Sequence, residues 1–491
     1  MLACARHSRG DRAAGGESRD PWLAWLGRSL ALSLSCLLTT VSVEGQQGSS
    51  AFLNQQRALE DEVRAALDKE LPTDQKFDMD WGGWYSFHLF QFDDGVNSSR
   101  TFRRHDIRGW TSASIDQGAH EFYLRGKLLF EDWNHGDSYD GNEDDVVGPN
   151  LDRGFYQFDL RKAAKACGGN RLDWDLNVKA GRDLVEFGTG YALSLPMDHV
   201  QIKLEVEKVE LTSLIGTSIR SVDDFDLSRP KYGSMHRNFY GLQAKYLGMD
   251  KHQPFFYALW NEDLRGQRAP DFFRNHDYDS YYLGIGSTGE LARDLRYGSE
   301  WVFEGGRSYM DRWPPTRRNI CAWAFDQSLE YLPHWPLQPR FIGEYMFASG
   351  DADRRLSPTD VEGGNTAGRD TSFVGFGYRD TGLAFGPRLS NVHIWRAGSA
   401  FKPLEKIECL RDLECGTDWF LYAKNRAHAA VSDETANEES GYLGWEMDYF
   451  ANWRITSDLA WTIRLGTFFP GQAFSDQTTR TFFLTGVTYS F

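Results

Sequence analysis

The feature that most constrains this chain is an alternation of apolar and polar residues with a period of two, which begins near Asp78 and continues to Phe491. Aromatic and β-branched runs such as NFYGLQAKYLG and PFFYALWNED are separated by stretches rich in Gly, Asp, Asn and Pro. About 18 such runs can be counted, and no pattern of helical length lies between them. Parallel βαβ units are therefore excluded. Because an open antiparallel sheet of this size would leave its edges unprotected, we expect an all-β chain whose sheet closes into a barrel.

The hairpin predicted over residues 443–469 indicates what each face of the barrel meets. One face of its first strand is apolar and aromatic, and consists of Leu443, Trp445, Met447, Tyr449, Ala451 and Trp453. The other face carries Gly444, Glu446, Asp448, Asn452 and Arg454, with Phe450 as its one apolar exception. Charges in mid-strand suit a hydrated lumen, and Trp and Tyr at the ends of an apolar face suit lipid headgroups. This pattern favours a transmembrane barrel over a water-soluble β protein.

Composition excludes several other classes of protein. The 491 residues include 54 Lys and Arg against 70 Asp and Glu, a net charge of −16, which argues against a nucleic-acid partner. A disordered chain would not contain 17 Trp. Beyond the first 45 residues no apolar run reaches the length of about 20 residues that a membrane helix needs. A secreted β enzyme and an outer-membrane barrel remain, and the chain's end at Phe491 inside an amphipathic strand is typical of the barrel.

The first part of the chain predicts export from the cytoplasm. Arg28 precedes the apolar run SLALSLSCLLTTVSV at 29–43, so residues 1–45 are expected to be a signal peptide, with a buried helix as the alternative. Residues 46–77 are expected to form a periplasmic helical segment, because apolar residues recur there at helical spacing. That helix would either lie against the mouth of the barrel or be a solvated leader. The barrel itself is assigned to residues 78–491.

No motif in the chain predicts an enzyme, a cofactor or a metal. The GxGxxG match at 284–289 lies in a run of strands and lacks the βαβ unit that dinucleotide binding requires. The acidic stretch 137–150 and the pair Asp351 and Asp353 fit either calcium ligation or a solvated loop, but the spacing fails the EF-hand pattern. Cys409 and Cys415 are close enough to close a small loop in an oxidising periplasm.

The candidate functional residues are the charged ones predicted to face the lumen. Rings of such charges select permeants by field and by hydrogen bonding, although they can also only solvate the lumen or pair with one another. From strand alternation we predict these pore-lining residues: Arg125, Lys127, Arg161, Lys179, Lys203, Glu446, Asp448, Arg454 and Arg464.

Several segments, in their order along the chain, resemble the alginate export (AlgE-like) outer-membrane porin family. They are VKAGRDLVEFGTGYAL, MDHVQIKLEVEKVELTSLIG, EYMFASGDAD, RLSNVHIWRAGSAFKP and LGWEMDYFANWRITSDLAWTIRLGTFFPG. The resemblance implies an 18-stranded barrel whose charged pore passes an anionic polysaccharide across the outer membrane. It also implies that Arg182 lines the pore, whereas strand parity directs Arg182 toward lipid unless a bulge intervenes. The family often has Gln where this chain has Asp183.

Two functions are consistent with these features. The first is export of an alginate-type polysaccharide, and the second is uptake of sugars or other small solutes by a general or sugar-specific porin. The net charge of −16 weakens the first slightly, but net charge does not report the field inside a pore. Either function implies the outer membrane of a Gram-negative-type bacterium, with membrane lipid, the barrel assembly machinery and possible periplasmic export proteins as partners. A barrel enzyme or adhesin would need a reactive group of residues on the rim, and no pattern indicates one.

Overall fold

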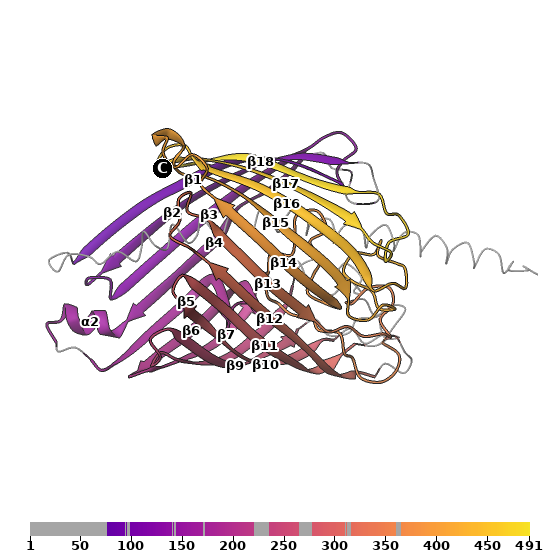
Figure 1. The fold of residues 1–491 in the computed structure, drawn as a ribbon. Helices are drawn as coiled ribbons and strands as arrows, with labels where there is room; N and C mark the ends of the chain where they lie inside the picture. The colour runs from indigo at the N-terminus through magenta and orange to yellow at the C-terminus, as the bar shows by residue number, and fades with distance from the viewer. Residues whose placement is uncertain are drawn as a thin grey trace, which may run out of the picture.

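The computed structural model describes residues 76–93, 95, 99–139, 141, 144–169, 172–219, 235–264, 277–309, 311, 316–359 and 365–491. All 18 strands belong to one antiparallel sheet, in which each strand pairs with its neighbours along the chain. The first strand, β1 (Phe77–Phe92), also pairs with the last, β18 (Arg480–Ser490), and this pairing closes the barrel (Figure 1). The predicted all-β barrel is therefore confirmed. The predicted signal peptide and almost all of the predicted N-terminal helical segment lie outside the described residues.

The remaining elements follow the chain in order. They are β2 (Arg100–Ile115), β3 (His120–Trp133), β4 (Asp144–Asp159), α2 (Leu160–Ala166), β5 (Trp174–Phe187), β6 (Leu193–Val206), β7 (Val209–Ser218), β8 (Arg237–Tyr246), β9 (His252–Asp263), β10 (Asp279–Ala292), β11 (Leu295–Ser308), β12 (Arg318–Tyr331), β13 (Arg340–Ala348), β14 (Val392–Phe401), η2 (Glu408–Leu410), β15 (Leu413–Lys424), β16 (Tyr442–Arg454) and β17 (Leu459–Pro470). Among the described residues, no helix has the length and apolar character needed to cross a membrane.

The alternation places large apolar side chains on the outside of the barrel. Trp81 is 70% exposed, Ile215 64% and Ile285 62%, whereas the inward-facing Asp106 and Arg108 are 1% and 2% exposed. In water such an arrangement would oppose the hydrophobic effect. In a bilayer it is favourable, because the apolar side chains meet lipid and every wall strand has a hydrogen-bonded neighbour on each side.

The predicted hairpin over 443–469 is formed by β16 and β17, with residues 455–458 as its turn. Phe450 and Arg464 are directly paired across it. One detail of the prediction is wrong: Leu443 is fully buried rather than exposed to lipid. The pairing of β15 with β16 slips by one residue there, and Gly444 has a φ of 128°, so the alternation reverses at this end of the strand.

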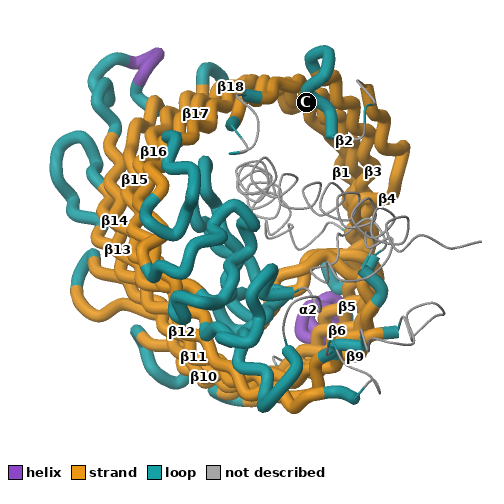
Figure 2. Tube along the Cα trace, turned by 90° about the vertical axis from the view of Figure 1, so that its right-hand side faces the viewer, coloured by secondary structure: helices purple, strands orange, loops and turns teal. Residues whose placement is uncertain are grey.

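The two ends of the barrel differ in their connections. At one end the turns include two-residue connections at 207–208 and 293–294, and Phe77 and Phe491 lie at this end. At the other end the connection between β13 and β14, loop 349–391, folds back into the barrel, where loops fill the side lined by β10–β16 (Figure 2). Outer-membrane barrels keep their short turns in the periplasm, so the long loops are extracellular.

A second segment that enters the lumen is the tip of the β5–β6 hairpin, residues 183–197. Strand β4 pairs with β5 only as far as Gly154 and Arg182. Beyond these residues the tip of the β5–β6 hairpin leaves the wall and lies in the lumen. There the hydroxyl of Tyr191 donates to the carbonyl of Phe347 on β13. Gly181 sits at the bend with a φ of 137°, and a Cβ there would lie 2.3 Å from the carbonyl oxygen of Gly154.

The tip and loop 349–391 pack on each other and on the inner wall. Leu193 forms a parallel bridge with Phe376, and the ring of Phe187 lies edge-on to Tyr257 of β9. These rings belong to a single buried apolar cluster inside the barrel. The lumen is therefore not wet throughout: on the side that carries the inserted segments it contains an apolar core.

Candidate pore and its two walls

The inserted segments cover the wall formed by β10–β16, and carboxylates on this wall hold loop 349–391 in place. Glu446 of β16 is fully buried and accepts hydrogen bonds from the backbone N–H groups of Leu383, Ala384 and Phe385, at 2.6, 2.6 and 2.9 Å. Asp448, two residues along the same face, accepts from the Leu383 N–H at 3.2 Å. Both residues were predicted to line the pore. They do face inward, but they lie beneath the loop and satisfy its backbone instead of meeting the lumen.

Two glutamates on β11 act in the same way. Glu300 accepts from the backbone N–H and the hydroxyl of Thr189 in the β5–β6 tip, both at 2.6 Å. Glu304 accepts from the Val374 N–H at 2.9 Å and from the Tyr278 hydroxyl at 2.5 Å. Both carboxylates are fully buried. Much of the negative charge on this wall therefore accepts hydrogen bonds from the inserted segments and is not accessible to a permeant.

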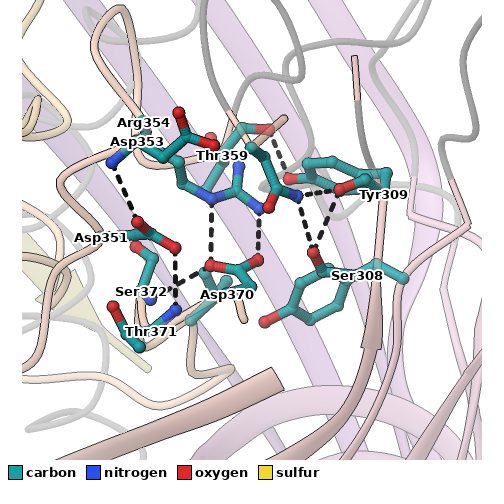
Figure 3. Close-up of polar contacts among 12 residues, drawn as sticks. Ser308, Tyr309, Asp351, Asp353, Arg354, Thr359, Asp370, Thr371 and Ser372 are labelled. Atoms are coloured by element: carbon teal, nitrogen blue, oxygen red, sulfur yellow. Dashed lines mark hydrogen bonds and ion pairs between the residues drawn. The ribbon is translucent and has the colours of Figure 1, made fainter. Parts of the chain in front are cut away.

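Loop 349–391 has a polar core of its own (Figure 3). The guanidinium of Arg354 pairs with Asp370 at 2.6 Å, and the two side chains are 1% and 0% exposed. Asp351 accepts from the N–H groups of Asp353 and Thr371, both at 2.9 Å, so its carboxylate joins the start of the loop to its middle. The acids at 351 and 353, which the sequence left open between calcium ligation and a solvated loop, thus bind backbone.

The other wall, formed by β17, β18 and β1–β5, is rich in cations. Its inward-facing basic residues include Arg464, Arg104, Arg108, Arg125, Lys127, Arg153 and Lys179, together with Arg480 of β18, which pairs with Asp433. Its inward-facing carboxylates include Asp106, Glu131, Asp152 and Asp183, with Glu121 and Asp175 nearer the periplasmic end. We call this surface the basic wall. The described loops lie against the opposite wall, along β10–β16 (Figure 2).

The carboxylates of the basic wall are shared between arginines. Asp152 pairs with Arg108 at 2.9 Å and with Arg125 at 2.7 Å, and Arg108 also pairs with Asp106 at 2.9 Å. Asp183 pairs in the same manner with Arg153 and with Lys179. These networks hold the guanidinium groups in fixed positions and leave the carboxylates little free charge.

Two cations of the basic wall have no such partner. Within the part of the chain that the structure describes, the side chains of Lys127 and Arg464 make no hydrogen bond and no ion pair. Lys127 lies within electrostatic range of Asp152 and Arg108, and Arg464 lies near the ring of Phe450. These two side chains are therefore cations of the basic wall with which a permeant anion can pair.

The other residues predicted to line the pore have varied positions. Lys179 and Lys203 face inward, and Lys203 is 3.7 Å from Glu210 on β7. Arg454 lies at the periplasmic end of β16, where it donates to the Ser457 carbonyl. Arg161 is not on a strand: β4 ends at Asp159, whose side chain accepts from the Lys162 N–H and caps helix α2. The strand position predicted for Arg161 is therefore wrong, but its guanidinium still donates to Glu205 of β6, at 3.1 Å, on the inward face of that strand.

Arg182 lies on the outer face of the barrel. It pairs directly with Asp198 of β6, at 2.7 and 2.9 Å, and also donates to the Leu151 carbonyl. The next outward positions on β6 are Val200 and Ile202, which are exposed apolar residues. Strand parity therefore predicted the position of Arg182 correctly, and the pore-lining role implied by resemblance is wrong for this residue. Arg182 lies at the extracellular border of the outer apolar belt, where lipid headgroups can solvate an ion pair.

Arg104, Arg108 and Arg153 of the basic wall were missed in the sequence. Arg104 and Arg108 follow strict alternation on β2, but their outward neighbours include Arg103 and His105, so the strand does not read as amphipathic. Arg153 follows a bulge at which the β3–β4 register shifts, so its parity could be counted only from the C-terminal end of β4, where it matches Gln157. A search that allowed polar residues on both faces of a strand could have found Arg104 and Arg108.

The remaining sequence features have structural roles only. The glycine-rich match at 284–289 lies within β10, where Gly284 and Gly286 leave room for the rings of Tyr257 and Phe255. Cys409 and Cys415 are both free thiols. Within the described ranges, no group of three or more His, Cys, Asp or Glu residues could hold a metal ion.

Comparison with known proteins agrees with this geometry. The family model described as Alginate export matches residues 202–486, which is more than half of the chain. The chain belongs to the alginate export family. No curated protein matches it in sequence. This member of the family is an outer-membrane channel, and family membership supports alginate-type export as its function.

Solved structures show a similar fold at low sequence identity. OccK2 (OpdF) of Pseudomonas aeruginosa is 12% identical, with a TM-score of 0.50, over 85% of this chain and 99% of that one. A BenF-like porin from Pseudomonas fluorescens Pf-5 is 11% identical, with a TM-score of 0.48, over 84% and 98% of the two chains. At these identities the likeness to OccK2 supports the barrel fold alone.

Proposed function

We propose that this alginate export channel conducts an anionic polysaccharide outward along the basic wall. The observation that carries the proposal is the presence there of two cations without a direct partner, Lys127 and Arg464, opposite a wall whose acids bind the inserted loop. A polyuronate carries a carboxylate on each sugar. Successive carboxylates can exchange between neighbouring cations, and binding at many weak sites allows a polymer to enter and to leave.

The overall acidity of the chain is compatible with this role. Net charge does not report the potential inside a pore, because buried and paired groups contribute little to it. Glu300, Glu304 and Glu446 are fully buried beneath the inserted segments. The field at the basic wall is set by nearby charges, and there the side chains of Lys127 and Arg464 have no carboxylate partner among the described residues.

Reversing the two unpaired charges tests the proposal. In planar bilayers under a KCl gradient, we expect the wild-type channel to prefer anions, and K127E/R464E to lower the anion-to-cation permeability ratio by about tenfold, because charge is focused in a confined lumen. The same variant should lose block by oligouronates. Arg293→Glu is the matched control, since Arg293 is 85% exposed on the β10–β11 turn, outside the lumen.

Two results would contradict the proposal. One is a wild-type channel that prefers cations or is indifferent to ion sign. The other is equal block by neutral maltooligosaccharides and by oligouronates of the same length, which would favour a general sugar porin.

A further inference from the structure

Phe450 is an aromatic residue on the polar, inward face of β16, and its surroundings form a hollow in the wall. Inward-facing residues of five strands are directly paired in one row around the barrel, in the order Arg340, Ala400, Gly416, Phe450 and Arg464. The row lies nearer the periplasmic end than Glu446 and Asp448, which hold the inserted loop. It therefore lies on the side from which an exported polymer enters.

Small residues create the hollow. A Cβ at Gly416 would lie 2.3 Å from Cζ of Phe450, and a Cβ at Gly398 would lie 2.2 Å from Oδ1 of Asp418. The Phe450 ring thus covers the backbone of Gly416. Arg340, Ile342, Arg396 and Ala400 complete the lining together with Ser399.

The arginines around the ring differ in their pairing. Arg396 pairs with Asp418 at 2.9 Å and with Glu344 at 3.4 Å, and Arg340 lies 3.7 Å from Glu414. On the other side of Phe450, the guanidinium carbon of Arg464 lies 5.9 Å from the ring centroid. Atoms in contact are about 3.5–4 Å apart, so Arg464 stands beside the ring without being stacked on it. Its Nε is buried and has no hydrogen-bond partner among the described residues.

We propose that Phe450 and Arg464 form a subsite that binds one uronate unit as the polymer enters from the periplasm. The C–H face of the pyranose stacks on the Phe450 ring, and the carboxylate pairs with the Arg464 guanidinium. An aromatic face and a cation side by side match the two chemical features of a uronate ring, whereas a residue needed only to cover Gly416 could be any apolar one. This subsite rests on the proposed function and adds a recognition step to it.

The test is the residence time of oligouronate block in single-channel recordings of the full-length protein, with oligouronate added on the periplasmic side. Phe450→Leu keeps an apolar cover over Gly416 but removes the aromatic face. We expect it to shorten the residence time about three- to tenfold, the ratio that corresponds to loss of one aromatic contact. Phe450→Trp should restore it. Tyr449→Leu is the matched control, because Tyr449 is 43% exposed on the outer face of the same strand.

A neutral probe separates the two halves of the subsite. For neutral cello-oligosaccharides, we expect Phe450→Leu to shorten block, whereas Arg464→Gln should shorten block only for oligouronates. If wild-type and Phe450→Leu channels have the same oligouronate residence time, or if Phe450→Trp does not restore it, the subsite is wrong while the proposed function stands. If oligouronates do not block the wild-type channel, the proposed function fails and the subsite fails with it.

Discussion

Glu446→Ala is expected to raise the single-channel conductance of this protein and to make the current noisy. The change removes the carboxylate that accepts from the N–H groups of Leu383, Ala384 and Phe385. Leaving one buried polar group without a partner costs about 1–3 kcal/mol, and removing one partner of a buried charged network costs about 3–5 kcal/mol. Destabilisation of that size exceeds what an inserted loop can absorb without leaving its place, so the loop should move away from the wall and widen the channel.

The measurement compares conductance and current noise in planar bilayers. Glu446→Gln should have an intermediate effect, because an amide keeps one acceptor oxygen but points donors at the loop's N–H groups. Glu290→Ala is the control, since Glu290 lies near the periplasmic rim and pairs with Lys251 at 3.1 Å. A correctly folded Glu446→Ala channel with wild-type conductance and noise would show that the loop does not depend on this carboxylate.

Asp370→Asn is expected to loosen loop 349–391 at neutral pH. The substitution leaves Arg354, whose side chain is 1% exposed, buried without its counter-ion, at a cost of about 3–5 kcal/mol. We expect trypsin to cleave the loop much faster in intact outer membranes, at arginines that the folded loop protects. Asp412→Asn is the matched control, because its ion pair with Arg411 is exposed and lies outside this loop. Equal cleavage of Asp370→Asn and wild type would contradict the structural role of this pair.

The same pair predicts how the loop responds to acid. Burial alone would raise the pKa of Asp370, but the guanidinium of Arg354 outweighs burial and lowers it below its ordinary value. A carboxyl whose pKa is lowered by folding contributes stability that is fully present above the ordinary value of about 4 and is lost as pH falls through the lowered pKa. Wild-type loop protection should therefore persist at neutral pH and fail only in strong acid, whereas Asp370→Asn should lack this acid step.

These expectations concern a loop whose position could not be predicted from the chain. Asp351 and Asp353 gave no indication of whether they bind calcium, water or backbone, because the partners of Asp351 include Thr371, twenty residues along the chain. Likewise the alternation on β16 showed that Glu446 faces inward, but it could not show that loop residues near 383 cover it. Pairings of this kind arise only when the barrel has closed and the loop has folded into it.

Local irregularities account for the other differences. Leu443 lies at a register shift and Arg153 follows one, and one extra residue in a strand reverses the direction of every side chain on its far side. Arg161 follows an aspartate that caps a short helix, a local signal that the uninterrupted alternation concealed. At Arg182 the alternation is regular, and its parity predicts the outward direction correctly. Only the pore-lining role carried over from the family was wrong for this residue.

Strand alternation is sufficient to predict a closed antiparallel barrel with apolar residues outside and charges inside, because side chains of a strand alternate in direction whatever lies around them. The same alternation marks Phe450 as the exception on the polar face. Alternation does not show which inward charges remain available to a permeant, since this depends on where the loops fold. Lys127 and Glu446 obey the same alternation, yet one belongs to the basic wall and the other is buried under loop 349–391. The difference is made by contacts between segments far apart in the chain, which no local period encodes.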